Sequence, residues 1–124
     1  MKIISQKEIP NLHKPDGTKT WYYLFNEYEI HYNEISPKST QPWHHHEKIQ
    51  ETLLIIEGSL VVKWKIDNKI KTQTVKQGGL IEFGVISHTV ANRSSKKTKF
   101  ICFKQVLSGK NKRELLKTDK IVDE

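Results

Sequence analysis

The stretch HHHEKIQETLLIIEG, which runs from His44 to Gly58, contains the residues that predict both the fold and a site. Successive side chains of a β-strand point to opposite faces, so His44 and His46 project to the same side and His45 points away. Glu51 follows His46 after four intervening residues. Two alternate imidazoles and a carboxylate are ligands that divalent transition metals accept. The stretch therefore predicts a metal site built on strands.

A further ligand is expected from a neighbouring strand, and His88 is the only histidine that follows the stretch. It lies in the segment GGLIEFGVISHTVAN, which spans residues 78–92. The remaining histidines, His13 and His31, are isolated and are interpreted as surface or hydrogen-bonded residues, while His45 is expected at the rim. The predicted metal ligands are His44, His46, Glu51 and His88.

The two segments resemble the two motifs of the cupins. The first cupin motif is His-x-His, then Glu after three or four residues and Gly after six more, as in His44, His46, Glu51 and Gly58. The second begins with Gly and leads to His and, four positions later, Asn, as in Gly78, His88 and Asn92, although Gly79 stands where Asp is usual. The resemblance covers roughly residues 38–92. It implies a double-stranded β-helix, or jelly roll, with this ligand set, and says little about substrate.

The length of 124 residues fits one domain with a single modest core. Short segments with strand character recur between turn residues, which indicates an all-β domain. We expect a single-domain, cupin-like β-barrel of eight or nine strands. Its parts are N-terminal strands in residues 1–37, the barrel core in 38–106, and a basic C-terminal tail or short helix in 107–124.

Three segments allow more detailed predictions. Residues 52–56 are continuously apolar and predict a strand that is covered on both faces. Residues 28–33 alternate with a period of two, which places Tyr28, Ile30 and Tyr32 on one face. Asp67 and Asn68 predict a two-residue hairpin turn, because both residue types tolerate left-handed backbone conformations.

The net charge of +7 is unevenly distributed. Residues 1–92 hold 11 Lys or Arg against 10 Asp or Glu, whereas residues 93–124 hold 10 against 4. Aromatic residues do not alternate with these charges as a base-stacking surface requires, so a solvated basic face is the preferred interpretation and nucleic acid is not an expected partner.

Cysteine content and hydropathy indicate a compartment. The single cysteine, Cys102, allows no intrachain disulfide, agrees with a reducing compartment, and is expected to be buried and inert. The sequence shows no signal peptide and no run long enough to cross a membrane. Cytoplasmic residence is therefore expected.

Three functional hypotheses follow. The first is a metal-dependent enzyme, by resemblance a dioxygenase or isomerase, that acts on a small organic molecule with Fe, Mn, Ni, Co, Cu or Zn; ligand type does not choose among these metals. The second is a non-catalytic module that binds or senses a small ligand. The third is an interaction protein whose basic tail binds nucleic acid. In each case the strand edges and aromatic residues favour a homodimer.

Overall fold

The computed structural model describes residues 1–106 and 118–123. This part of the chain contains one short 3-10 helix, η1 (Gln6–Glu8), and eleven strands, against the eight or nine expected. The strands are β1 (Asn11–His13), β2 (Thr18–Leu24), β3 (Tyr28–Ile35), β4 (His44–His45), β5 (Ile49–Glu57), β6 (Ser59–Ile66), β7 (Lys69–Lys76), β8 (Leu80–Glu82), β9 (His88–Ala91), β10 (Thr98–Val106) and β11 (Ile121–Val122).

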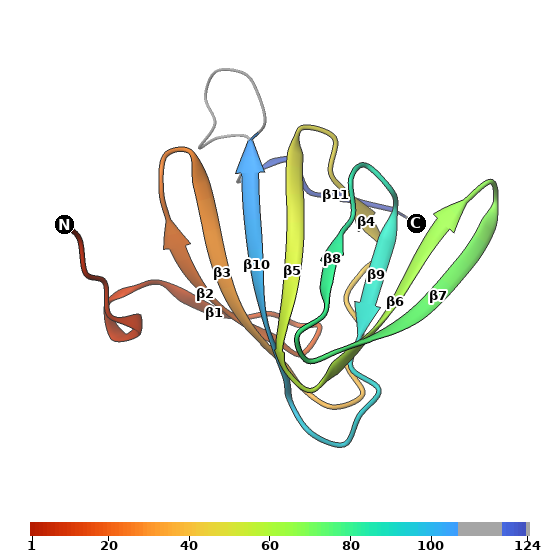
Figure 1. Cartoon of the computed structure of the whole chain (residues 1–124), viewed down its shortest axis with the longest axis horizontal. Coiled ribbons are helices and arrows are strands. Elements are labelled where there is room, and N and C mark those ends of the chain that lie inside the picture. Colours follow the sequence, from red (N-terminus) through yellow and green to blue (C-terminus); the bar gives the residue numbers. More distant parts are fainter. Residues whose placement is uncertain (107–117, 124) are drawn as a thin grey trace.

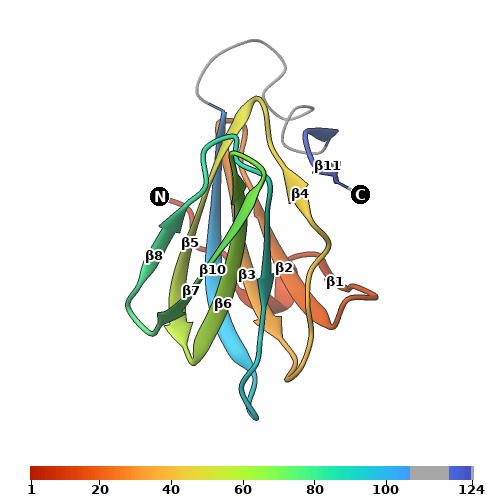
Figure 2. The same ribbon diagram turned by 90° about the vertical axis from the view of Figure 1, so that its right-hand side faces the viewer.

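The strands form two antiparallel sheets that lie against each other (Figure 1, Figure 2). The six-stranded sheet has the order β1-β2-β3-β10-β5-β8, and the five-stranded sheet has the order β11-β4-β9-β6-β7. The all-β prediction is confirmed. Within the described residues the two hydrogen-bonded sheets share no strand, so closure into a barrel is not confirmed.

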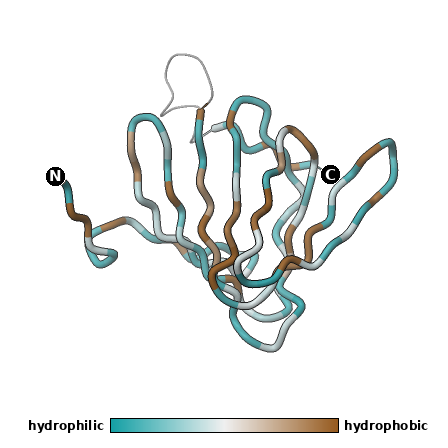
Figure 3. The backbone as a smooth tube through the Cα atoms, in the orientation of Figure 1, coloured by the Kyte–Doolittle hydropathy of each residue, from teal (hydrophilic) through white to brown (hydrophobic). Residues whose placement is uncertain are grey.

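The hydrophobic core lies between the sheets and takes residues from both. Leu53, Ile55 and Phe100 come from the six-stranded sheet, and Leu60 and Val62 come from the five-stranded sheet. Hydrophobic residues recur along the central strands β3, β10 and β5 (Figure 3). The five core side chains named above are buried, and such burial contributes about 1.5–3 kcal/mol for a large aliphatic or aromatic side chain.

Of two predictions about strand faces, one is confirmed and one is wrong. Tyr28, Ile30 and Tyr32 share one face of β3 as predicted; this face points outward and is half-buried, while the inward face carries the buried residues Glu29, His31 and Asn33. Residues 52–56 of β5 are covered on one face only and not on both, because Leu54 and Ile56 are exposed. In both strands the period of two is present. The interior of this sheet accepts polar side chains where it approaches the candidate site, and apolar side chains of β3 and β5 lie on its outer face.

Two turns behave as their residues predict. Asp67 and Asn68 both have positive φ, of 49° and 63°, and Ile66 pairs with Lys69 directly across the turn, so the two-residue hairpin is confirmed. Gly58, with φ of 86°, ends β5, and a Cβ at this position would lie 2.8 Å from Thr98 Oγ1. Glycine is therefore required there for both backbone conformation and space.

The C-terminal tail or helix is not confirmed. Residues 107–117, on which most of that prediction falls, lie outside the described residues. Where the description resumes, Ile121–Val122 form β11, which pairs antiparallel with β4 at His44 and His45. The described residues contain no helix whose length and hydrophobicity would allow it to cross a membrane.

Candidate metal centre

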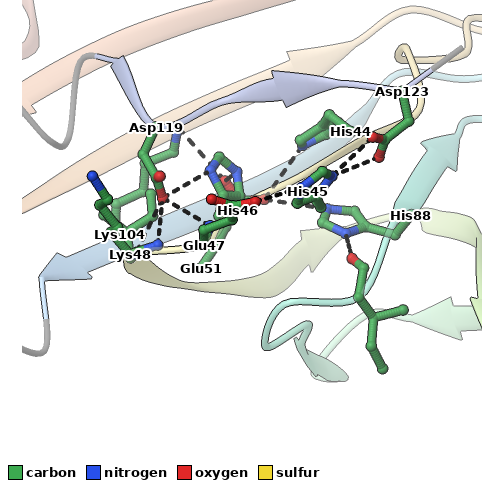
Figure 4. A network of polar contacts seen from close by, with 12 residues as sticks. His44, His45, His46, Glu47, Lys48, Glu51, His88, Lys104, Asp119 and Asp123 are labelled. Atoms are coloured by element: carbon green, nitrogen blue, oxygen red, sulfur yellow. Dashed lines mark hydrogen bonds and ion pairs between the residues drawn. The ribbon is translucent and has the colours of Figure 1, made fainter.

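The structure brings His44, His46 and Glu51 into one group between the two sheets, and the fourth predicted ligand, His88, lies beside Glu51 but outside that group. His44 on β4 and His88 on β9 are register partners in the five-stranded sheet, and His46 follows directly after β4. Glu51 approaches from β5 of the other sheet (Figure 4). All four are buried, with exposures of 6% or less. The cluster therefore connects the two layers of the fold.

The distances describe a compact set of ligand atoms. His46 Nε2 lies 3.0 Å from Glu51 Oε2, His88 Nε2 lies 3.7 Å from Oε1, and His44 Nε2 lies 3.9 Å from Oε1. One ligand atom each from His44, His46 and Glu51 lies within 4.8 Å of the others, a spacing at which these residues could hold a metal ion. The ring centroid of His88 is 4.5 Å from that of His44.

Backbone carbonyls orient two of the imidazoles. His44 Nδ1 is 2.8 Å from the carbonyl oxygen of Pro42, and His88 Nδ1 is 2.8 Å from that of Ile86. A carbonyl can only accept a hydrogen bond, so each Nδ1 carries the proton and donates it. When such a ring is neutral, its lone pair is on Nε2, the nitrogen that lies nearest Glu51. This second hydrogen bond is the usual support for a metal-binding histidine.

The cluster of predicted ligands contains buried polar atoms that have no hydrogen-bond partner among the described residues. His46 Nδ1, His46 Nε2 and His88 Nε2 are buried and have no hydrogen-bond partner among the described residues. The 3.0 Å contact between His46 Nε2 and Glu51 lacks the alignment of a hydrogen bond. Leaving such groups unpaired in the interior costs about 1–3 kcal/mol each. Because a cation at this point would satisfy the two Nε2 atoms, the residues present fit a metal.

Electrostatics prepare the ligands for a cation. Burial lowers the pKa of His44, against the opposing influence of Glu51 and the Pro42 carbonyl, so the ring stays neutral at neutral pH. Burial alone would raise the pKa of Glu51, but the neighbouring rings of His44, His46 and His88, together with the positive charge of Lys104, hold it well below its ordinary value. Neutral imidazoles with a charged carboxylate are the protonation states that metal binding requires.

Two acidic residues near the end of the chain hold the histidine segment in place, and sequence reasoning missed both. Asp119 Oδ2 accepts hydrogen bonds from the backbone N–H groups of Glu47, Lys48 and Ile49, at 3.1, 2.9 and 3.1 Å. The same oxygen lies 4.0 Å from His46 Nδ1. Nothing in the sequence links Asp119 to a segment some 70 residues earlier.

Asp123 holds His45, the histidine of the segment that is not a predicted ligand. Its carboxylate lies 2.8 Å from His45 Nδ1 and accepts a 2.6 Å hydrogen bond from Ser87 Oγ. His45 therefore points away from the ligand cluster, as its alternate position predicts, and its side chain is 22% exposed. The hydrogen bond that His45 donates to the Asp123 carboxylate raises the pKa of His45.

A small cavity of about 40 Å³ adjoins the cluster, lined by His44 and Glu51 among others. It also contains His31, which the sequence places among surface or hydrogen-bonded residues. His31 is hydrogen-bonded, with Nε2 2.8 Å from Glu29 Oε1, but it is buried at 6% exposure. The one signal in the sequence is the alternation in β3, where His31 shares a face with Glu29 and Asn33. That face was not recognised as the buried one.

The cavity also changes the interpretation of the basic residues. Lys104 and Lys120, which belong to the basic segment 93–124, line it together with Lys14. Lys104 lies 3.6 Å from Glu51 Oε2, with only 14% of its side chain exposed. The prediction of a solvated basic face is therefore wrong for Lys104. Cys102 is buried as predicted, and burial raises its pKa well above the ordinary value, which keeps it a thiol.

The rest of the environment is apolar on the side of His88. The ring of Phe83 stacks on that of His88, with centroids 3.5 Å apart and planes inclined by 8°. Trp64 on β6 is the register partner of His88 in the five-stranded sheet and packs against the hydrophobic core. The second-motif residue Asn92 has a structural role, because its side-chain amide donates to the carbonyls of Ile35 and Lys96.

Comparisons with known proteins agree with this geometry. The family model described as the cupin domain matches residues 31–104. No curated protein matches the sequence.

Several solved structures share the fold. A structure of oxalate oxidase superposes with a TM-score of 0.67 at 16% identity, over 84% of this chain and 59% of that chain. A sugar phosphate isomerase from a cupin superfamily, from Silicibacter pomeroyi, gives 0.70 at 16% identity, over 84% and 75%. The oxalate decarboxylase formate complex from Lactobacillus farciminis gives 0.73 at 15%, over 94% and 34%. At these identities the likeness concerns the fold alone.

Proposed function

Because this chain belongs to the cupin domain family, we propose that it binds a divalent transition metal and acts as a metal-dependent enzyme on a small organic molecule. The proposed ligands are His44, His46, Glu51 and His88. The observation that supports the proposal most directly is the convergence of buried, unpaired Nε2 atoms on one carboxylate.

The ligand set leaves room for chemistry. Three neutral imidazoles and one carboxylate leave a bound divalent ion with net positive charge and, in octahedral geometry, two open positions. A metal held there would act as a Lewis acid or would activate oxygen, the two routes by which an isomerase or a dioxygenase would proceed. The chain's own residues orient His44 and His88 and keep His44 neutral, and His31, which is hydrogen-bonded to Glu29, lines the adjacent cavity.

Elemental analysis tests the metal site. Protein purified without nickel resin should contain close to one equivalent of Fe, Mn, Ni, Co, Cu or Zn, and Glu51→Gln and His88→Ala should lose most of it. His13→Ala, an exposed histidine outside the cluster, is the matched control and should keep the metal. If Glu51→Gln and His88→Ala retain the ion as fully as the control, the proposed ligand set is wrong.

Turnover decides between the two main classes. A metal-dependent enzyme should convert a small substrate only when loaded, and activity should return when the ion is restored after chelation. A compound that raises the melting temperature of the loaded protein but is never converted would instead favour the binding or sensing module. Activity that survives complete removal of the metal contradicts the proposal.

We also propose that the chain forms a homodimer through the outer face of the six-stranded sheet. One cross-strand row of this face is entirely apolar, and its members are Trp21, Tyr32, Ile101, Leu54 and Leu80. Leu54 and Leu80 are 39% and 60% exposed. A second copy is the preferred occupant, because the same apolar row on each copy can pair with itself about a two-fold axis.

Sedimentation measures this association. The protein should sediment as a dimer, and Leu54→Lys should shift it to a monomer without loss of bound metal. Ile70→Lys, which changes an exposed residue of the other sheet, is the control. A wild-type protein that remains monomeric at high concentration contradicts the proposed interface.

A further inference from the structure

The cavity beside Glu51 gathers three lysines from three separate parts of the chain. Lys14 lies in the turn between β1 and β2, Lys104 lies on β10, and Lys120 immediately precedes β11. His44 and Glu51 form the wall that this cavity shares with the metal cluster. A molecule in the cavity would therefore lie between the lysine side chains and the proposed metal ligands.

Lys104 lies between two acidic residues of the same sheet. It is the register partner of Glu29 on one side and of Glu51 on the other. Its Nζ lies 3.6 Å from Glu51 Oε2, and only 14% of its side chain is exposed. The geometry therefore places a largely buried basic side chain beside a proposed metal ligand.

The other two lysines have no comparable partner among the described residues. Lys104 alone of the three forms an ion pair there, with Glu51. The pKa of Lys14 is lowered by burial and then by the positive charges of Lys120 and Lys104, which is the effect of cations crowded into one space. Such crowding is unfavourable, and an anion placed between the ammonium groups would relieve it.

The charge on the cavity wall favours a negatively charged ligand. Its described lining residues carry three lysines and one carboxylate, Glu51. When Glu51 binds a divalent cation, the negative charge of its carboxylate is neutralised by that ion, and the excess of positive charge around the cavity increases. We infer that this cavity receives the carboxylate group of a small organic acid, which is the substrate of the proposed metal site. The inference rests on the proposed function, because the cation at Glu51 completes the positive environment.

Size favours a carboxylate over a larger anion. A cavity of about 40 Å³ accommodates roughly three water-sized groups, which suits a carboxylate. The lining residues that the structure describes include lysines and no arginine, so the cavity offers separate positive charges and no bidentate guanidinium. The rest of the described lining is polar at His31, Asn33 and Gln41 and less polar at Leu53, Phe100 and Cys102.

The test uses the whole protein loaded with Co(II), whose visible absorption reports metal binding and changes when a ligand reaches the ion. Acetate, its neutral analogue acetamide, and inorganic phosphate are titrated at constant ionic strength. Acetate should change the spectrum, acetamide should not, and phosphate should bind more weakly than acetate. Co(II) uptake is measured separately for every variant, so that loss of metal is distinguished from loss of anion binding.

The lysine variants locate the anion. Lys14→Met, which does not touch a proposed ligand, should take up Co(II) normally but bind acetate about tenfold more weakly, because one charge-assisted hydrogen bond is lost. Lys104→Met should weaken acetate by at least as much. Lys71→Met, which changes an exposed lysine of β7, should match the wild type.

The outcomes separate the two proposals. If Co(II) binds but acetate and acetamide act alike, or Lys14→Met binds acetate as the wild type does, the carboxylate inference is overturned and the metal site stands. Tighter binding of phosphate than of acetate also overturns it. If Co(II) is not taken up at all, the proposed function itself fails and the inference fails with it.

Discussion

At His44 and His88 a single backbone carbonyl determines which ring nitrogen carries the proton. The carbonyls of Pro42 and Ile86 each lie two residues before the histidine that they orient. The local backbone therefore supplies the supporting hydrogen bond without a dedicated side chain. Each imidazole presents a free Nε2 to Glu51 before any ion arrives, so little reorganisation is needed when one binds.

His31 gives a pH dependence that can be measured in the metal-free protein. Burial lowers its pKa below the ordinary value of 6.5, although Glu29 opposes this. Between its folded-state pKa and about 6.5 the unfolded chain therefore binds more protons than the folded chain, so the free energy of unfolding falls as the pH falls. His44 shifts in the same direction.

Replacement by glutamine should remove one such contribution. In His31→Gln the decline of unfolding free energy below pH 6.5 should become shallower, by up to about 1.4 kcal/mol per pH unit for one proton. Urea unfolding at several pH values measures it, and His13→Gln, at an exposed site, should follow the wild type. Parallel curves for His31→Gln and the wild type would show that His31 is not titrating as its burial implies.

Much of the candidate site could be predicted because the ligands obey short-range rules. Alternation on a strand selects His44 and His46 and excludes His45, and the structure places them accordingly. His31 could not be recognised in the same way. Its strand alternates clearly, but hydrophobicity suggests that the tyrosine face is internal, whereas the buried face is the one with Glu29 and His31. A polar interior reverses the usual inference from periodicity.

At the scale of elements, the short strand β11 and the residues beside it complete the histidine segment. Asp119 holds three consecutive N–H groups directly after His46, and its carboxylate is 7% exposed. Asp123 holds His45 on the opposite side of β4. The sequence suggests a tail because no local pattern records a contact between segments so far apart.

Asp119 should therefore affect metal binding without being a ligand. Asp119→Asn removes the negative charge and so weakens the three hydrogen bonds that the backbone N–H groups donate to this side chain. Metal affinity should fall by about 10–100-fold, the usual effect of losing a residue that positions a ligand. Competition with a chromophoric chelator, at a temperature where the variant is fully folded, measures it. Asp67→Asn in the exposed hairpin turn is the matched control. A variant that melts earlier but binds metal with unchanged affinity would show that Asp119 only stabilises the fold.

For the whole molecule, the proposed ligands come from both sheets. His44 and His88 belong to the five-stranded sheet and Glu51 to the six-stranded sheet, so a bound ion would join layers that otherwise meet through the hydrophobic core. This arrangement follows from the two-sheet topology. The strands could largely be predicted from alternation and turns, whereas the pairing of sheets depends on contacts that no single segment contains.

Metal removal should therefore weaken the fold as a unit. At a free ion concentration 100 times the Kd, binding to the folded state alone stabilises it by about 2.7 kcal/mol, which chelation would remove. Thermal unfolding with and without chelator measures the change, and Glu51→Gln should show almost none. Equal stabilisation of Glu51→Gln by the ion would place the binding elsewhere.

The pairing of Trp64 with His88 gives the protein its own optical reporter. An indole beside a proposed ligand should lose fluorescence when an open-shell ion such as Co(II) or Cu(II) binds, through transfer of excitation to the ion. Closed-shell Zn(II) should leave the emission nearly unchanged and reverse the quenching when it displaces Co(II). In Trp64→Phe the remaining emission, from Trp21 and Trp43, should respond much less, so ion occupancy could be followed in solution without any label.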